Sequence, residues 1–134
     1  MTDSQKAISD TKTILVVEDE GLLRDMVRSI LEGGGYRVLE ADSGGNALEV
    51  WQAQEGKIEL LLTDIMLPRG ISGLELARRL QERQPHLKII FTTGRAMRDL
   101  DRDAFEKINA QFLQKPYQHN ELIQLVKNVL AREA

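Results

Sequence analysis

The sequence predicts a single α/β domain built on a doubly wound parallel sheet, in which five strands alternate with five helices. Three observations support this fold class. Short apolar, β-branched runs recur along the chain, segments with helical spacing separate them, and no low-complexity linker interrupts the series. Alternating strands and helices form right-handed crossovers, which give a parallel sheet covered on both faces. The expected strands span 13–17, 36–41, 58–64, 87–93 and 110–114, and the expected helices span 22–31, 43–54, 74–84, 98–108 and 118–132.

The first strand, TILVV, follows a polar tail at residues 1–12, so we expect the folded domain to occupy residues 13–132. Three acidic residues end this strand, and helical spacing begins at once. Six apolar residues are expected on one face of the first helix: Leu22, Leu23, Met26, Val27, Ile30 and Leu31. The three consecutive glycines at 33–35 end this helix.

The second and third strands each lead into a helix with a recognisable start. The second strand, YRVLEA, precedes Ser43, whose side chain is suited to cap the second helix. The third strand, IELLLTD, is apolar enough for burial on both faces, yet it ends in a carboxylate, Asp64. After it, Ser72 and Glu75 have the spacing of a capping box, and the helix that they begin ends before Pro85.

The last part of the chain completes the alternation. The fourth strand, LKIIFTT, is broken by Gly94 and followed by a more polar helix at 98–108, which is rich in alternating charge. The fifth strand, AQFLQ, leads into the last helix. The inner face of that helix is expected to hold Leu122, Ile123, Val126 and Val129.

Composition excludes several classes of protein. The 18 basic and 21 acidic residues leave a net charge of −3, and no basic tract indicates a nucleic-acid partner. There is no cysteine, so disulfides, thiol catalysis and cysteine metal sites are excluded, and two scattered histidines do not form a metal cluster. No apolar run approaches the roughly 20 residues that cross a bilayer. The first residues are too polar for a secretory signal, so we expect a soluble, cytoplasmic domain without a membrane partner.

Polar side chains follow four of the expected strands, and this pattern predicts a site. They are Glu18 and Asp19 after the first strand, Asp64 at the end of the third, Thr93 at the end of the fourth and Lys115 after the fifth. Each alone has a common structural explanation, such as an acidic pair at a helix start or a turn residue. In parallel α/β sheets, however, ligands bind beyond the carboxyl ends of the strands, so the joint occurrence favours a functional site.

These residue types suit one chemistry. Three carboxylates close together repel one another and call for a cation, and hard oxygen ligands with open positions suit Mg²⁺. Asp64 could then act as a nucleophile that forms an aspartyl phosphate. Lys115 and the hydroxyl of Thr93 would bind the phosphoryl oxygens.

Five segments, in this order, resemble the receiver domains of two-component response regulators of the chemotaxis-regulator type: ILVVEDE, LLLTDIMLP, SGLELARRL, IIFTTGRA and FLQKP. The resemblance covers residues 13–132 and implies a flavodoxin-like (βα)5 sheet of strand order 2-1-3-4-5. It implies a phosphoacceptor signalling domain, not an enzyme, which nonetheless takes part in its own phosphorylation and dephosphorylation. The donor would be a sensor histidine kinase or a histidine phosphotransfer protein, the acceptor Asp64, and the cofactor Mg²⁺ or Mn²⁺.

The resemblance also implies roles in metal binding and in phosphoryl lifetime. Asp19 would ligate the metal directly, Glu18 would act through a water, and the backbone carbonyl of Met66 would be a further ligand beside Asp64. Glu18 stands where aspartate is more frequent, and the loop at 65–73 is one residue longer than the commonest form, as in receivers attached to hybrid kinases. Met66 and Arg95 occupy the positions that tune how long the phosphoryl group lasts.

Further roles concern the switch between states. Thr93 would be the switch hydroxyl and Phe112 the aromatic switch residue, although phenylalanine lacks the hydroxyl of the more frequent tyrosine. Lys115 would bind phosphate, and its bond to Pro116 would be cis, a form accessible mainly at proline. The signal would leave through an output face made of the expected fourth helix, fifth strand and fifth helix (98–108, 110–114 and 118–132), which would contact a partner or a second copy of this chain.

Three other functions are weaker. A phosphohydrolase of the haloacid-dehalogenase type places a second aspartate two residues after the nucleophile, where this chain has Met66, and the chain has no room for a cap domain. A dinucleotide-binding domain is disfavoured because GGGY follows a helix instead of linking a strand to one. A phosphate-independent binding module remains an alternative. The chain is expected to be either a stand-alone regulator or a receiver from a hybrid kinase or longer regulator.

Overall fold

Five parallel strands form one sheet in the computed structural model of the protein, which describes residues 11–95, 100 and 102–132. The strands are β1 (Thr13–Val17), β2 (Arg37–Ala41), β3 (Leu60–Asp64), β4 (Lys88–Thr93) and β5 (Ala110–Gln114). Their order across the sheet is β2-β1-β3-β4-β5, and every neighbouring pair is parallel, so the predicted fold class and strand order are confirmed.

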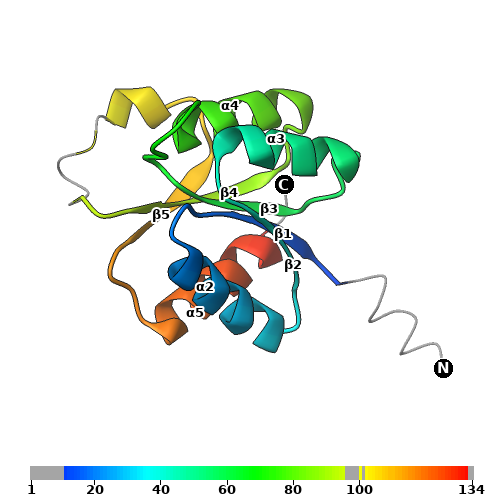
Figure 1. Ribbon diagram of the computed structural model, residues 1–134, viewed down its shortest axis with the longest axis vertical. Coiled ribbons are helices and arrows are strands. Elements are labelled where there is room, and N and C mark those ends of the chain that lie inside the picture. The colour runs from blue at the N-terminus through cyan, green and yellow to red at the C-terminus, as the bar shows by residue number, and fades with distance from the viewer. Residues whose placement is uncertain (1–10, 96–99, 101, 133–134) are drawn as a thin grey trace.

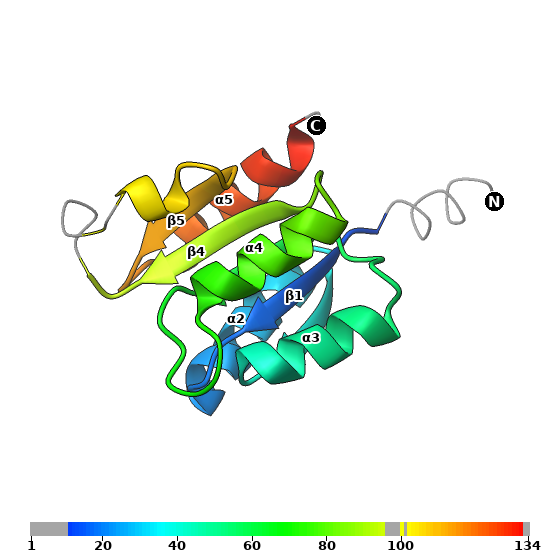
Figure 2. The ribbon, with the colours of Figure 1, turned by 90° about the horizontal axis from the view of Figure 1, so that it is seen from above.

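Helices cover both faces of the sheet. They are α2 (Gly21–Gly33), α3 (Gly44–Ala53), α4 (Gly73–Arg83) and α5 (His119–Ala131). Helices α3 and α4 lie over one face, and α2 and α5 lie over the other (Figure 1). Seen from above, α4 lies in front of the sheet, between β4 and β1 in this view (Figure 2). Among the residues that the structure describes, no helix is both long and apolar enough to cross a membrane.

Alternation along the strands produces two apolar cores. Leu15 and Leu61 belong to the cluster beneath α3 and α4, whereas Ile14 and Leu60 belong to the cluster beneath α2 and α5. Every residue of β1 is buried, which explains why the central strands are apolar at consecutive positions. The carboxyl edge of the sheet therefore rests on a rigid, two-sided core.

Two serines begin helices as the sequence predicts. The Ser43 hydroxyl accepts a hydrogen bond from the amide three residues later at 3.1 Å, and Ser72 accepts one from the Glu75 amide at 3.1 Å. The Glu75 carboxylate binds Arg78 and Arg79 at 3.1 and 3.0 Å instead of returning to the start of its own helix. The capping box at this helix is thus half formed.

The polar segment predicted as a helix at 98–108 differs from the prediction. Residues 98, 99 and 101 lie outside the described residues. The rest contains one 3-10 turn, η2 (Arg102–Phe105), followed by turns, so four α-helices are present in the described part of the chain. Phe105 is the residue of η2 that packs against the core, and its neighbours are mostly charged. A segment with so few apolar positions gains little from packing as a regular helix.

The inner face of α2 is narrower than predicted. Val27 and Leu31 are buried, but Leu22 is 88% exposed and Met26 is 49% exposed. Leu22 lies in the first turn of α2, ahead of Val27, the first buried residue of the helix, so this turn extends beyond the core. Helical spacing predicted the helix correctly, but it did not show which of its apolar residues the rest of the protein buries.

The predicted N-terminal tail falls mostly outside the described residues, which begin at residue 11. The Lys12 carbonyl already accepts a hydrogen bond from the Arg37 amide at 2.9 Å. Pairing between the first two strands therefore starts one residue before β1.

Candidate functional site

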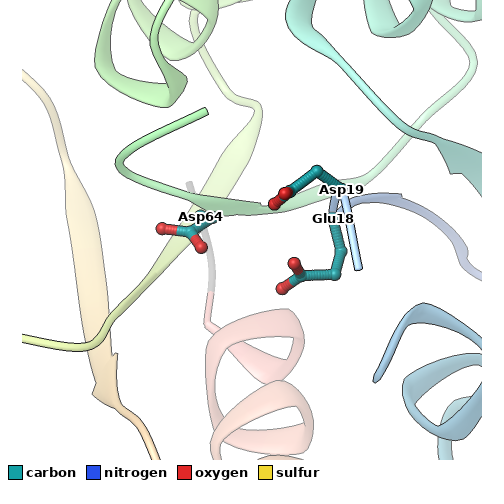
Figure 3. A group of neighbouring side chains, drawn as sticks. All are labelled: Glu18, Asp19 and Asp64. Carbon is teal, nitrogen blue, oxygen red and sulfur yellow. The ribbon is translucent and has the colours of Figure 1, made fainter. Parts of the chain in front are cut away.

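Three carboxylates gather at the carboxyl edge of the sheet because β1 and β3 are neighbours. Val17 and Thr63 are register partners, so the residues that follow them lie side by side. Glu18, Asp19 and Asp64 each place a carboxylate oxygen within 4.8 Å of those of the other two. Figure 3 shows the three side chains at the ends of the two strands.

Glu18 is a buried carboxylate, only 5% exposed. Its Oε2 accepts a hydrogen bond from the Glu20 amide at 3.1 Å, and its Oε1 accepts one from Lys115 Nζ at 3.0 Å. Burial raises the pKa of the Glu18 carboxyl, while the bonds from Glu20 and Lys115 act in the opposite direction. A buried charge of this kind is tolerated because each oxygen has a donor.

Lys115 connects the two strand ends. Its Nζ lies 2.9 Å from Asp64 Oδ2 as well as 3.0 Å from Glu18 Oε1. Burial by itself would lower the pKa of Lys115, but hydrogen bonds to the two carboxylates and their charges outweigh this effect and raise it. The lysine therefore keeps its positive charge. Its amide donates to the Thr93 carbonyl at 2.7 Å, and the Lys115–Pro116 peptide bond is cis.

Thr93 presents a hydroxyl at the same edge. Its side chain is 3% exposed, and Oγ1 accepts a hydrogen bond from the Arg95 amide at 3.0 Å. A hydroxyl that accepts one bond still has its own proton to donate. Thr93 is thus oriented by the turn after β4 and retains a donor for an incoming oxygen.

Met66 and Arg95 lie at the exposed rim of the site. The Met66 amide donates to Asp64 Oδ1 at 3.1 Å, and the Met66 side chain is 63% exposed. Arg95 is also exposed, while its amide holds Thr93. That the Met66 carbonyl ligates a metal stays a prediction.

Phe112 belongs to an aromatic cluster that the sequence did not reveal. Its ring centroid lies 5.6 Å from that of Phe91 on β4 and 5.2 Å from that of Phe105 on η2, and the last two rings are 5.2 Å apart. These are all three phenylalanines of the chain. Because they are up to 21 positions apart in sequence, only the pairing of β4 with β5 brings them together. The cluster packs η2 against the sheet.

The donor set fits a hard divalent cation. All three clustered side chains offer carboxylate oxygens, which suit Mg²⁺. Asp19 is exposed, and its carboxylate has no hydrogen-bond partner within the described ranges, whereas both oxygens of Glu18 already accept bonds. In their charged forms, three carboxylates outnumber the one ammonium by two charges, which a divalent cation would neutralise before a phosphate approaches.

Comparisons with known proteins identify the family and several relatives of this chain. The family model of the response regulator receiver domain matches residues 14–127. The chain is 40% identical to the response regulator receiver protein CpdR of Brucella abortus (strain 2308), covering 89% of this chain and 97% of that protein. It is 32% identical to the sensor kinase CckA of the same organism, covering 94% of this chain but 13% of the kinase. The crystal structure of a response regulator receiver protein from Sinorhizobium medicae WSM419 is similar with a TM-score of 0.82 at 28% identity, over 93% of this chain and 99% of that one.

Proposed function

Since the chain belongs to the response regulator receiver domain family, whose role is phosphoacceptor signalling, we propose that Asp64 is its phosphoacceptor. The observation that carries this assignment is the Lys115 ammonium, which lies 2.9 Å from Asp64 and 3.0 Å from Glu18. It places a cation between two carboxylates, of which Asp64 ends β3 and is the more exposed, at 15% of its side chain against 7% for Glu18. The donor is a phosphohistidine on a sensor histidine kinase or on a histidine phosphotransfer protein.

The transfer is a substitution at phosphorus. An Asp64 carboxylate oxygen attacks the phosphorus, the bond from phosphorus to the imidazole nitrogen breaks, and the nitrogen keeps the electron pair. The product is an acyl phosphate on Asp64. Acetyl phosphate would supply the same group with acetate as the leaving group. Lys115 pairs with one phosphoryl oxygen, and the Thr93 hydroxyl donates to another.

We assign the divalent cation to the acidic cluster. Asp19, which has an exposed carboxylate without a partner within the described residues, ligates it directly, and Glu18 acts through a water because both its oxygens accept other bonds. Asp64 and the Met66 carbonyl are the remaining ligands. Bound Mg²⁺ supplies charge neutralisation and orientation for the phosphoryl oxygens.

The first prediction concerns metal dependence. Incubated with acetyl phosphate and Mg²⁺, the chain should gain one phosphoryl group by intact mass spectrometry, because the cation offsets the repulsion between carboxylates and phosphate. Mn²⁺ should substitute, and chelation with EDTA before donor is added should abolish the gain. Uptake at the same rate in EDTA would refute the metal assignment. No uptake from acetyl phosphate or any phosphohistidine donor would instead favour the phosphate-independent binding module.

The rim of the site suits a protein donor. Leu22 and Met66 are 88% and 63% exposed, and both follow closely on residues of the acidic cluster. We take these two exposed apolar side chains, three positions after Asp19 and two after Asp64, as part of the surface that the donor covers. A donor that carries its phosphohistidine to Asp64 would bury them. The relatives include both a receiver protein and a sensor kinase, the two settings expected for this chain.

We further propose that Met66 and Arg95 tune phosphoryl lifetime. Each follows a residue of the site by two positions and lies on its exposed rim, where an attacking water would enter. A bulky apolar Met66 beside a long cationic side chain would hinder that approach.

The aromatic cluster provides a route from phosphate to surface. If Thr93 moves toward the phosphoryl group, it changes the space beside Phe112, whose ring contacts Phe105 on η2. Packed aromatic rings have discrete arrangements, so such a change would shift η2 as a unit. The output face would then differ between the two states, and a partner or a second copy of the chain could read the difference.

The second prediction tests this route. Amide NMR shifts should change on adding beryllofluoride and Mg²⁺, both around Asp64 and across residues 102–114. In a Phe105→Leu variant, the changes around Asp64 should persist while those at 102–108 shrink, because the ring contacts are lost. Changes confined to the loops around Asp64 in the unmodified protein would rule the route out.

A further inference from the structure

The turn that carries the acidic pair is held at several atoms of Glu18. Its amide donates to the Ala41 carbonyl at 3.1 Å, and its two carboxylate oxygens bind the Glu20 amide and the Lys115 ammonium. Its carbonyl oxygen accepts a hydrogen bond from Arg24 Nη1 at 2.7 Å. Arg24 lies outside the proposed site. Its contact with Glu18 can therefore be removed by mutation without changing a proposed metal ligand.

Arg24 also forms an ion pair with Glu40 on the second strand. Its Nε lies 3.8 Å from Glu40 Oε1, a buried oxygen that has no hydrogen-bond partner in the described part of the chain. The other oxygen of Glu40 accepts a bond from Arg28 at 2.9 Å, and Arg28 also pairs with Glu32 at 3.1 Å. The Arg24 side chain is 24% exposed, so its charge is partly shielded from solvent and partly balanced by Glu40.

We propose that Arg24 is a positioning residue for the metal site, a role that rests on the proposed function. By binding the Glu18 carbonyl, the guanidinium fixes the backbone between the end of β1 and the start of α2, from which the carboxylates of Glu18 and Asp19 project. Residues that orient metal ligands without touching the metal commonly change metal affinity by about 10- to 100-fold when removed. Arg24 acts in this way through a backbone carbonyl.

Two effects of Arg24 on metal affinity oppose each other, and this makes the proposal testable. As a cation near the cluster, Arg24 repels a divalent ion, so losing its charge would strengthen binding. As an anchor of the turn, it keeps the carboxylates together, so losing its hydrogen bond would weaken binding. Arg28 belongs to the same network through Glu40, but it makes no hydrogen bond to Glu18 in the described structure. It therefore carries a positive charge on the same helix without holding the Glu18 backbone.

The experiment compares Arg24→Met, Arg24→Lys and Arg28→Met in the full chain. Mg²⁺ affinity is measured by isothermal titration calorimetry at a temperature where each variant is folded. Arg24→Met should weaken binding about tenfold. Arg28→Met should leave affinity unchanged or slightly raised, and Arg24→Lys should recover part of the loss because lysine retains one charged donor. Thermal unfolding without metal is recorded for each variant.

Labelling with acetyl phosphate supplies a second readout. In Arg24→Met, the Mg²⁺ concentration for half-maximal labelling should rise in step with the weaker affinity, while the rate at saturating Mg²⁺ stays near that of the unmodified protein. A residue that merely stabilises the fold would lower the unfolding temperature without moving this concentration. Unchanged or stronger Mg²⁺ binding by Arg24→Met would overturn the inference and leave the proposed function intact. If the unmodified chain bound no Mg²⁺ and accepted no phosphoryl group, the proposed function itself would fail.

Discussion

Asp64→Asn should take up no phosphoryl group under conditions that add one to the unmodified chain. The amide has nearly the shape of the carboxylate but lacks its charged, nucleophilic oxygen. Lys115 still has Glu18 as a partner in the variant, so no buried cation is left alone. The free energy of unfolding should change little or rise, because the variant removes one of three carboxylates that repel one another. Intact mass spectrometry and urea denaturation measure the two quantities.

A matched control is Asp25→Asn on the exposed side of α2, which removes the same charge outside the site and should label normally. Peptide mapping of the unmodified protein should place the added mass on Asp64. Full labelling of Asp64→Asn, or a phosphoryl group mapped to Asp19, would show that the acceptor was assigned to the wrong carboxylate.

Gly73→Ala should destabilise the fold and the site together. Gly73 opens α4, and a Cβ atom at this position would overlap the Asp64 carbonyl oxygen and lie 2.9 Å from its carbonyl carbon and 3.1 Å from the Ile65 Cα. These are backbone atoms of a buried strand end, which cannot move away as a flexible side chain would. Overpacking of this kind costs typically about 1–3 kcal/mol, and we expect a loss at or above the upper end. Because Asp64 must shift, labelling should also slow.

The comparison variant is Gly45→Ala in the first turn of α3, where a Cβ atom would meet no other atom within 4 Å. Alanine suits a helix better than glycine, so this variant should be neutral or more stable by up to about 1 kcal/mol. Urea denaturation measures the free energy of unfolding of the two variants, and initial labelling rates measure their phosphoryl uptake. If Gly73→Ala had the same free energy of unfolding and the same labelling rate as Gly45→Ala, the close approach of α4 to Asp64 would affect neither the stability nor the site.

Local patterns in the sequence were sufficient for most of the architecture. Apolar runs and helical spacing identified all five strands and four of the helices, because burial imposes these periods on the residues themselves. The strand ends also predicted that Glu18, Asp64 and Lys115 meet at one edge of the sheet, as they do in the structure, since a charge after a buried run needs a partner. The fold class and family followed from these features without any tertiary contact.

Sequence periodicity did not predict which apolar helix residues are buried or whether every polar segment forms a regular helix. Leu22 and Met26 have the spacing of an inner face yet are exposed, and the polar segment at 98–108 contains a 3-10 turn in its described part. Periodicity reports what a segment could bury, whereas the neighbouring elements decide what it does bury.

Only the tertiary structure decided which distant groups meet. The strand order brings Lys115 to Glu18, 97 positions away, and the pairing of β4 with β5 gathers the three phenylalanines. No local sequence pattern predicts that Arg24 donates to the Glu18 carbonyl. An arginine in the first turns of an amphipathic helix is usually solvated, and every residue has a backbone carbonyl, so the acceptor leaves no trace in the sequence. The sequence determined which groups the site contains, and the packing of strands determined their partners, since hydrogen bonds and ion pairs act over a few ångströms of space and not along the chain.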